Sequence, residues 1–222
     1  MWLHMPSTDS DARSAEEHAT AAAGRSPFSR RGSARRGELL DAAVRVIGRV
    51  GARSVRVEDV AMEANVSTPL VYYYFENRTE LMAEAFRHAN LHLLASHGDD
   101  EGLDGRERVL RRLLRDIGDD QETTQAWVLW GELAGAAVFD ESLREPINDG
   151  YQAWVDQIGS LIRVGQQDGS IAGSVEADRA AETLTSMMDG LSTRSILGGL
   201  TVQRAEELAA ECVERVLCPR PG

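Results

Sequence analysis

A tight break between two short helical patterns lies within residues 58–81. Before the break, apolar residues recur at helical spacing, at Val57, Val60, Ala61 and Ala64. The pattern stops at Asn65, a residue type that tolerates the left-handed backbone found at helix ends. Ser67 and Thr68 offer N-cap side chains, and Pro69 suits a first helical turn, so a second helix should begin within a residue of Thr68. Two helices joined by so short a turn indicate a helix-turn-helix, whose second helix places its first residues on DNA bases.

A wider set of residues around this turn follows the pattern of a known family. The landmarks are small, apolar and aromatic residues with one basic residue after them: Ala42, Ala43, Gly51, Val60, Ala61, Val66, Ser67, Tyr72, Phe75 and Arg78. With this spacing the region resembles the N-terminal domain of the TetR family of transcriptional repressors. Arg56, Asn65 and Ile47 depart from the family pattern, and Arg56 is a poor helix cap. The resemblance implies an all-α fold: a three-helix, helix-turn-helix DNA-binding domain, then a helical ligand-binding and dimerisation domain.

The resemblance also places particular side chains on DNA. Pro69 and Leu70 would offer apolar contacts to a thymine methyl group, and Thr68 would bond a base edge or a phosphate. Arg78, at the start of a fourth helix, would clamp a phosphate together with the N-terminus of that helix. Val71 and Phe75 are expected to be core residues.

Three consecutive tyrosines follow in the second helix of the motif. Tyr72 and Tyr73 would donate their hydroxyls to phosphates, and Tyr74 would contact a base. The alternative is aromatic packing. Because three successive helical residues point in three directions, at least one of them must face solvent or DNA.

The charge of the chain is distributed unevenly. A net charge of −12 would by itself argue against a nucleic-acid partner. Residues 25–94, however, carry 11 arginines against 8 acidic residues, so the positive charge lies beside the predicted reading helix. Arg35, Arg36 and Arg56 are therefore added to the candidate DNA-binding residues.

The N-terminal residues differ in composition from those that follow. Residues 1–27 are rich in Ser, Ala, Thr and acidic side chains without sustained periodicity, which predicts a disordered tail. Residues 28–36 form a basic arm, and two interpretations stay open: contact with phosphates or the minor groove, or a solvated tail. The predicted DNA-binding domain spans residues 28–80, and residues 81–222 form the second domain.

Helical periodicity continues along the rest of the chain. The first helix of the predicted DNA-binding domain is expected over residues 38–50. Asn77 can cap a further helix after Phe75. No useful length alternates with a period of two, so strands are not expected. Further helices are expected between Gly-rich and Asp-rich breaks, over residues 106–117, 122–139, 143–167, 176–197 and 202–217.

Large apolar side chains gather in the second domain. They include Trp127, Trp130, Tyr151, Trp154 and Met187. Such side chains at helical spacing are usually ordinary core, yet central helices rich in them can also line a ligand cavity. The family resemblance implies a cavity, so these five are the candidate ligand-binding residues.

The last two helices carry more apolar surface than a terminal pair needs for itself. Their apolar residues are Leu184, Met187, Met188, Leu191, Ile196, Leu197, Leu208, Val213, Val216 and Leu217. The resemblance implies that these helices pair with a second subunit, giving a homodimer whose two heads meet a palindromic site. The other interpretation is that both helices complete the core of the monomer.

Signals for catalysis, metals and membranes are weak or absent. The sequence has no phosphate-binding glycine loop, nucleophile elbow or zinc-protease helix, so neither enzyme activity nor a cofactor is expected. Glu84, His88 and His92 lie at four-residue steps, a spacing that can hold a metal, but long helices often carry such faces and no metal site is predicted. Without a membrane-spanning or signal segment, no membrane partner and a cytoplasmic location are expected.

These features predict a dimeric transcriptional repressor that binds a double-stranded DNA operator and is released by a small-molecule effector. The alternatives are a helical ligand-binding or metal-sensing protein without DNA binding, and a small helical-bundle enzyme. A DNA affinity that falls steeply with salt would exclude the first, and a turnover assay tests the second.

Overall fold

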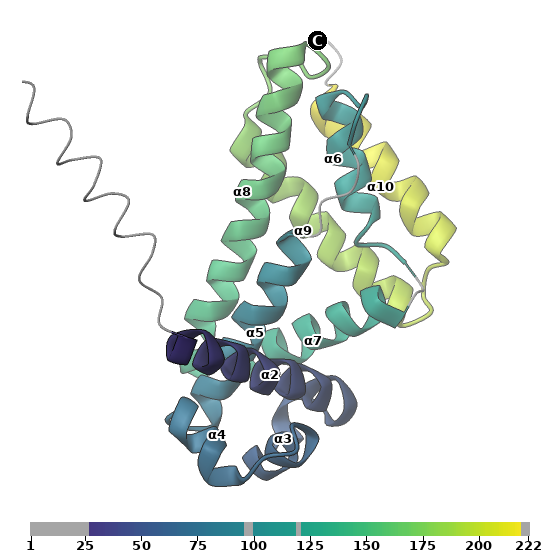
Figure 1. Cartoon of the computed structure of the whole chain (residues 1–222). Helices are drawn as coiled ribbons and strands as arrows, with labels where there is room; N and C mark the ends of the chain where they lie inside the picture. The colour runs from purple at the N-terminus through teal and green to yellow at the C-terminus, as the bar shows by residue number, and fades with distance from the viewer. Residues whose placement is uncertain (1–26, 96–99, 119–120, 219–222) are drawn as a thin grey trace, which may run out of the picture. The chain divides into compact units, whose positions relative to one another are not determined.

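The computed structural model describes residues 27–95, 100–118 and 121–218, and every regular element in these ranges is a helix (Figure 1). The predicted all-α fold is therefore confirmed for the described residues. None of their helices is both long and apolar enough to cross a membrane. The elements in chain order are α2 (Pro27–Val50), the 3-10 helix η1 (Ala52–Ser54), α3 (Val57–Glu63), α4 (Thr68–Tyr74), α5 (Arg78–Ala95), α6 (Gly105–Leu114), α7 (Gln121–Ala137), the 3-10 helix η2 (Glu141–Leu143), α8 (Arg144–Asp168), α9 (Ala177–Ile196) and α10 (Val202–Leu217).

Helix α2 begins well before the predicted start at residue 38. It starts at Pro27, so the basic arm over residues 28–36 is helical rather than irregular. Proline is favourable at the start of a helix because its fixed φ angle suits the first turn, and no further proline follows before Val50. The chain divides into two compact units, Met1–Glu38 and Leu39–Gly222, and the dividing point lies inside α2. The predicted tail, residues 1–27, lies outside the described residues except for Pro27.

The turn between α3 and α4 has the predicted geometry. Asn65 has a φ angle of 52°, in the left-handed region. The amide of Val66 donates to the carbonyl of Ala61 at 2.9 Å, and the amide of Asn65 donates to the carbonyl of Met62 at 3.1 Å. This pair of bonds closes α3 by the Schellman arrangement, which satisfies carbonyls that the helix end would leave unpaired. Helix α4 then begins at Thr68, where the sequence predicts it.

The first hydrophobic core joins the helix-turn-helix region, residues 39–77 and called the head below, to α5 and α7. Leu81 and Phe86 of α5 are buried in it, and so are Leu129 and Leu133 of α7. The head contributes buried side chains from α2, η1, α3 and α4, among them Leu39, Ala43, Ile47, Ala52, Val57, Val60, Val71 and Phe75. The boundary predicted at residue 80 falls inside this core, because apolar residues on both sides of it are buried against one another.

The second hydrophobic core lies among α6, α8, α9 and α10. Five of the residues predicted at a subunit interface are buried here, namely Leu184, Met188, Leu191, Val213 and Leu217. These five favour the interpretation in which the last two helices complete the core of the monomer. Ile196 and Leu197, at the end of α9, are instead 38% and 78% exposed.

Candidate DNA-binding surface and effector pocket

Helix α4 presents an exposed surface that is largely aromatic. Tyr73 and Tyr72 are 79% and 49% exposed, and Pro69 is also exposed. Val71 and Phe75 are buried, as their helical positions predict. The inward residues thus fix the helix on the first core, while phenol hydroxyls and the proline ring face outward, where they can meet phosphates and base edges.

The other predicted contacts of α4 are less accessible. Thr68, Leu70 and Tyr74 are half-buried. Tyr74 packs against the first core and meets the ring of Tyr73 edge-on, with ring centroids 5.1 Å apart. Of the three tyrosines, Tyr73 is therefore the one most available to a ligand as large as DNA.

Arg78 opens α5, but its guanidinium group is bonded within the head. Its Nε donates to the carbonyl oxygen of Val55 at 2.8 Å, and its Nη2 donates to the carbonyl oxygen of Ala52. Two of its donors are thus used by backbone carbonyls, which gives Arg78 a structural role in the head, and its contact with a phosphate stays a prediction. Arg78 holds the first residue of η1 and the residue after η1 against the start of α5.

Several arginines of the basic region have partners within the protein. Glu63 of α3 accepts hydrogen bonds from Arg45 at 2.8 Å and from Arg49 at 3.0 Å, both in α2. These bonds, that from Arg45 first, lower the pKa of Glu63. The guanidinium of Arg53 lies 4.7 Å from the centroid of the Phe139 ring. Glu63 therefore offsets part of the positive charge that Arg45 and Arg49 contribute.

The three arginines assigned to DNA differ in their surroundings. Arg56, directly before α3, is exposed and forms no ion pair with any described residue. It does not cap α3 through its side chain, in agreement with its poor capping chemistry. Arg35 is bonded to Glu38 within α2, and Arg36 follows it in the same helix. Arg56 is thus the best placed of the three for a phosphate.

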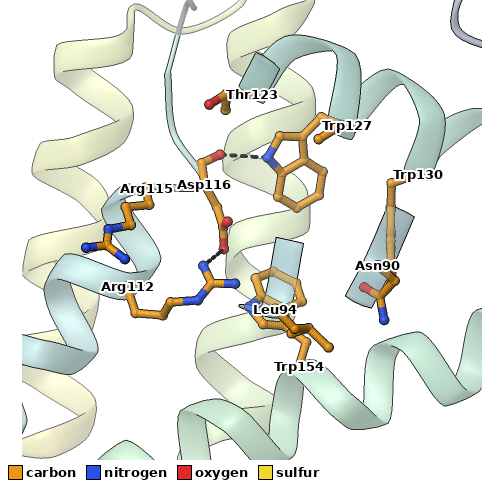
Figure 2. A pocket seen from close by; sticks show the side chains of 10 residues that line it. Asn90, Leu94, Arg112, Arg115, Asp116, Thr123, Trp127, Trp130 and Trp154 are labelled. Atoms are coloured by element: carbon orange, nitrogen blue, oxygen red, sulfur yellow. Dashed lines mark hydrogen bonds and ion pairs between the residues drawn. The ribbon is translucent and has the colours of Figure 1, made fainter. Parts of the chain in front are cut away.

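A pocket with a cavity volume of about 70 Å³ lies among α5, α6, α7 and α8 (Figure 2). Trp127, Trp130 and Trp154, three of the five predicted ligand-binding residues, line it. Tyr151 contacts Trp130 behind the lining, and Met187 packs against the second core. The sequence reasoning missed the other lining residues, which are Asn90, Leu94, Arg112, Arg115, Asp116, Thr123 and Ala126. Since one water needs roughly 10–15 Å³ of such volume, the pocket can hold a small organic molecule.

One wall of the pocket is ionic. Nη1 of Arg112 donates to Oδ2 of Asp116 at 2.8 Å, and Nε of Arg112 donates to Gln157 at 2.8 Å. Burial raises the pKa of Asp116, although Arg112 opposes the shift. The carbonyl oxygen of Asp116 accepts the indole N–H of Trp127 at 2.7 Å. This wall comes from the end of α6 and the residues after it, where the sequence shows only a charged helix end.

The aromatic wall is held by ring contacts. Trp127 and Trp154 meet at a steep angle with centroids 5.9 Å apart, and Trp130 meets Tyr151 at 4.7 Å. The indole N–H of Trp130 donates to the hydroxyl of Tyr151 at 3.1 Å. Phe86 of α5 packs against Trp130, with centroids 4.9 Å apart. The rings therefore link α5, α7 and α8 around the pocket.

The helices that line the pocket also hold the head. Leu94 lies on α5, which begins with Arg78, and Trp130 lies on α7, two residues before Glu132. Glu132 accepts the backbone N–H of Ala52 at 2.8 Å, while Arg78 donates to the carbonyl of the same residue. Both backbone polar groups of Ala52 are thus hydrogen-bonded, the N–H to α7 and the carbonyl to α5. A shift of either helix at the pocket would therefore displace η1.

Glu84 and His88, considered above for metal binding, have other partners. His88 Nε2 lies 2.7 Å from Oδ1 of Asp41, and Glu84 forms an ion pair with Arg87 at 2.8 Å. The side chain of His92 lies outside the described residues. The described residues contain no group of side chains that could hold a metal ion.

Asp189 of α9 gives a testable dependence of stability on pH. Its Oδ1 is buried without a hydrogen-bond partner among the described residues, and burial raises its pKa from 3.8 to about 6. The folded state therefore binds this proton more tightly than the unfolded state. The resulting stability is present below pH 3.8 and is lost as the pH rises through about 6.

We expect Asp189→Asn to raise the melting temperature at about pH 8, and to raise it less at about pH 4.5. Thermal unfolding followed by circular dichroism checks this, and a gain that does not change with pH would contradict it.

Comparison with known proteins agrees with this arrangement. Residues 39–85 match the family model of bacterial regulatory proteins of the tetR family, and residues 105–218 match that of the BetI-type transcriptional repressor, C-terminal. The HTH-type transcriptional regulator BetI of Rhizobium meliloti (strain 1021) is 30% identical over 173 residues, which are 73% of this chain and 78% of that protein.

Two solved structures show the same fold over most of the chain. A TetR-family transcriptional regulator from Rhodococcus sp. has 33% identity and a TM-score of 0.77, over 83% of this chain and 99% of its own. A transcriptional regulator from Saccharomonospora viridis, solved in complex with choline, has 26% identity and a TM-score of 0.66, over 82% and 96% of the two chains. All of these proteins are transcriptional regulators rather than enzymes. The chain belongs to the TetR family of DNA-binding transcriptional regulators, with a C-terminal region of the BetI type.

Proposed function

We propose that the protein represses transcription by binding a palindromic operator as a two-fold dimer, and that a small molecule in the tryptophan-lined pocket releases it. The observation that carries this proposal is the pair of hydrogen bonds that hold the backbone of Ala52. Glu132, on the helix of Trp127 and Trp130, holds its N–H, and Arg78, on the helix of Leu94, holds its carbonyl. Pocket and head thus share two rigid helices.

Release requires the ligand to bind one arrangement of α5 and α7 more tightly than another. A ligand that fills the space between Trp130 and Leu94 would favour one spacing of these helices. Through Arg78 and Glu132 that spacing would set the position of η1 and the helix-turn-helix. In a dimer, a small change in each head alters the distance between the two reading helices, which must match one helical turn of DNA.

The choline bound to the Saccharomonospora viridis regulator supports a small organic molecule as the kind of effector for this chain too. For the dimer, the supporting feature is the exposed apolar end of α9, at Ile196 and Leu197. Analytical ultracentrifugation of the protein with and without operator DNA tests the stoichiometry. One subunit per operator would exclude the two-fold arrangement.

The reading head is tested by replacing Tyr73. We expect Tyr73→Ala to weaken operator binding about tenfold, the loss of one charge-assisted hydrogen bond to a phosphate, without changing the melting temperature. Tyr73→Phe separates the hydroxyl from the ring. The measurement is fluorescence anisotropy with DNA fragments from upstream of the gene at low and moderate salt.

Arg204→Ala is the control for the replacement of an exposed side chain outside the head, because Arg204 lies on α10 in an exposed pair with Glu207. It should leave DNA affinity unchanged. If Tyr73→Ala binds the operator as tightly as the unmodified protein does, α4 is not the reading helix.

A further inference from the structure

The polar groups of the pocket indicate the chemical class of its ligand. We infer that the effector is an organic carboxylate with a small apolar body, its carboxylate held by the indole N–H of Trp154 and the guanidinium of Arg112. The inference rests on the proposed function, since it assumes that this pocket is the effector site, and it specifies the ligand of that site.

The first observation is the orphaned indole nitrogen of Trp154. This side chain lines the pocket, is only 6% exposed, and its Nε1 is buried without an acceptor among the described residues. The indoles of Trp127 and Trp130, in contrast, both donate to protein oxygens. A buried N–H normally has an acceptor, and an indole can only donate. The group that satisfies Trp154 must therefore bring an oxygen or another acceptor.

The second observation is the orientation of Arg112. Its Nη1 and Nε are bonded to Asp116 and Gln157, which leaves Nη2 without an acceptor among the described residues. Figure 2 shows the nitrogen-bearing edge of Trp154 turned toward the guanidinium of Arg112. Both residues line the pocket, and one anionic group can accept from both donors. Carboxylate is the usual partner of a guanidinium, because its two oxygens match the fork of N–H groups.

The charge of the lining supports an anion over a cation. Two guanidinium groups, of Arg112 and Arg115, lie in the lining, and its one carboxylate, Asp116, is already paired with Arg112 at 2.8 Å and so is not available to a cation. Tryptophan cages do bind quaternary ammonium ions through their ring faces. Here such a cation would lie beside the guanidinium of Arg112, and it would leave the indole N–H of Trp154 without an acceptor.

The apolar body of the ligand has a defined place as well. Trp127, Trp130, Leu94 and Ala126 supply the remaining surface, and the cavity volume of about 70 Å³ sets a small size. A single ring or a short chain would lie against the indole faces while its carboxylate reaches the ionic wall. Phenylacetate and hexanoate meet this description, and their amides have nearly the same shape without the charge.

The experiment is isothermal titration calorimetry of the full-length protein without DNA, using phenylacetate, hexanoate, the two corresponding amides and choline. We expect each carboxylate to bind at least about tenfold more tightly than its amide, because a charge-assisted hydrogen bond is lost in the amide. Trp154→Phe, which keeps a ring but removes the N–H, should weaken carboxylate binding by about the same factor and amide binding much less. Arg115→Gln should also weaken the carboxylates, by removing one positive charge.

Arg204→Ala is the matched control, since it removes an exposed arginine of α10 and should leave all five affinities unchanged. Circular dichroism verifies that each variant is folded. If Trp154→Phe does not fold, Arg115→Gln still tests the inference. The inference is wrong if neither carboxylate binds more tightly than its amide, or if choline binds more tightly than both. If carboxylates bind but do not release operator DNA, the proposed function is wrong, while the inferred ligand class is unaffected.

Discussion

Arg112→Ala is expected to lower the free energy of unfolding by about 3 kcal/mol, because it leaves the carboxylate of Asp116 without its partner. The two side chains are 10% and 19% exposed and lie 2.8 Å apart. Breaking a buried ion pair costs roughly 3–5 kcal/mol, and the residual exposure of Asp116 places this pair at the lower end. Burial already raises the pKa of Asp116, and removal of Arg112 would raise it further. The loss of stability should therefore be larger at about pH 8 than at about pH 5.

Chemical denaturation followed by tryptophan fluorescence measures this effect, because Trp127 and Trp154 lie beside the pair. Arg204→Ala, which breaks an exposed pair with Glu207, should change the free energy of unfolding by less than about 1 kcal/mol. Replacing both partners, Arg112→Met with Asp116→Leu, should recover most of the loss, since no uncompensated charge remains. If Arg112→Ala is no less stable than Arg204→Ala, the pair does not contribute to the fold as the geometry indicates.

Arg78→Met is expected to reduce both stability and DNA affinity, with a loss of about 2 kcal/mol in the free energy of unfolding. The methionine keeps much of the apolar stem but cannot donate to the carbonyl oxygens of Val55 and Ala52. Those two hydrogen bonds come from a charged group, so each is stronger than a neutral bond, although water can reach the half-buried site and compensate in part. Without them η1 and the head lose one of their two attachments to the helices of the pocket.

The measurement pairs thermal unfolding with operator binding for Arg78→Met and Tyr73→Ala. Tyr73 is 79% exposed, so its variant should lose DNA affinity at an unchanged melting temperature, whereas Arg78→Met should lose both. Should Arg78→Met keep its melting temperature and lose only DNA affinity, the guanidinium would be a phosphate contact after all. The contrast separates a residue that touches DNA from one that positions the head.

Local chemistry determined the parts of the structure that sequence reasoning predicted correctly. Asn65 adopts the left-handed conformation and α4 begins at Thr68, because helix ends and starts depend on a few neighbouring residues. Val71 and Phe75 are buried and Tyr73 is exposed, because a helix turns about 100° per residue and its pattern of apolar residues selects one face. The α10 bounds, Val202–Leu217, agree with the prediction for the same reason.

Tertiary structure decided what depends on residues far apart in the chain. The partners of Arg78 lie in the loop around η1, and Glu132 reaches Ala52 across 80 positions, so no local pattern shows either bond. The ionic wall of the pocket was missed because a charged helix end is usually solvated, and only the packing of α6 against α8 buries Arg112. The sequence by itself determined the turn, the family and most of the α-helices of this protein, but not the start of α2. Which polar groups are paired, buried or left facing the pocket was decided by the fold, because desolvation and hydrogen-bond geometry depend on neighbours that only packing brings together.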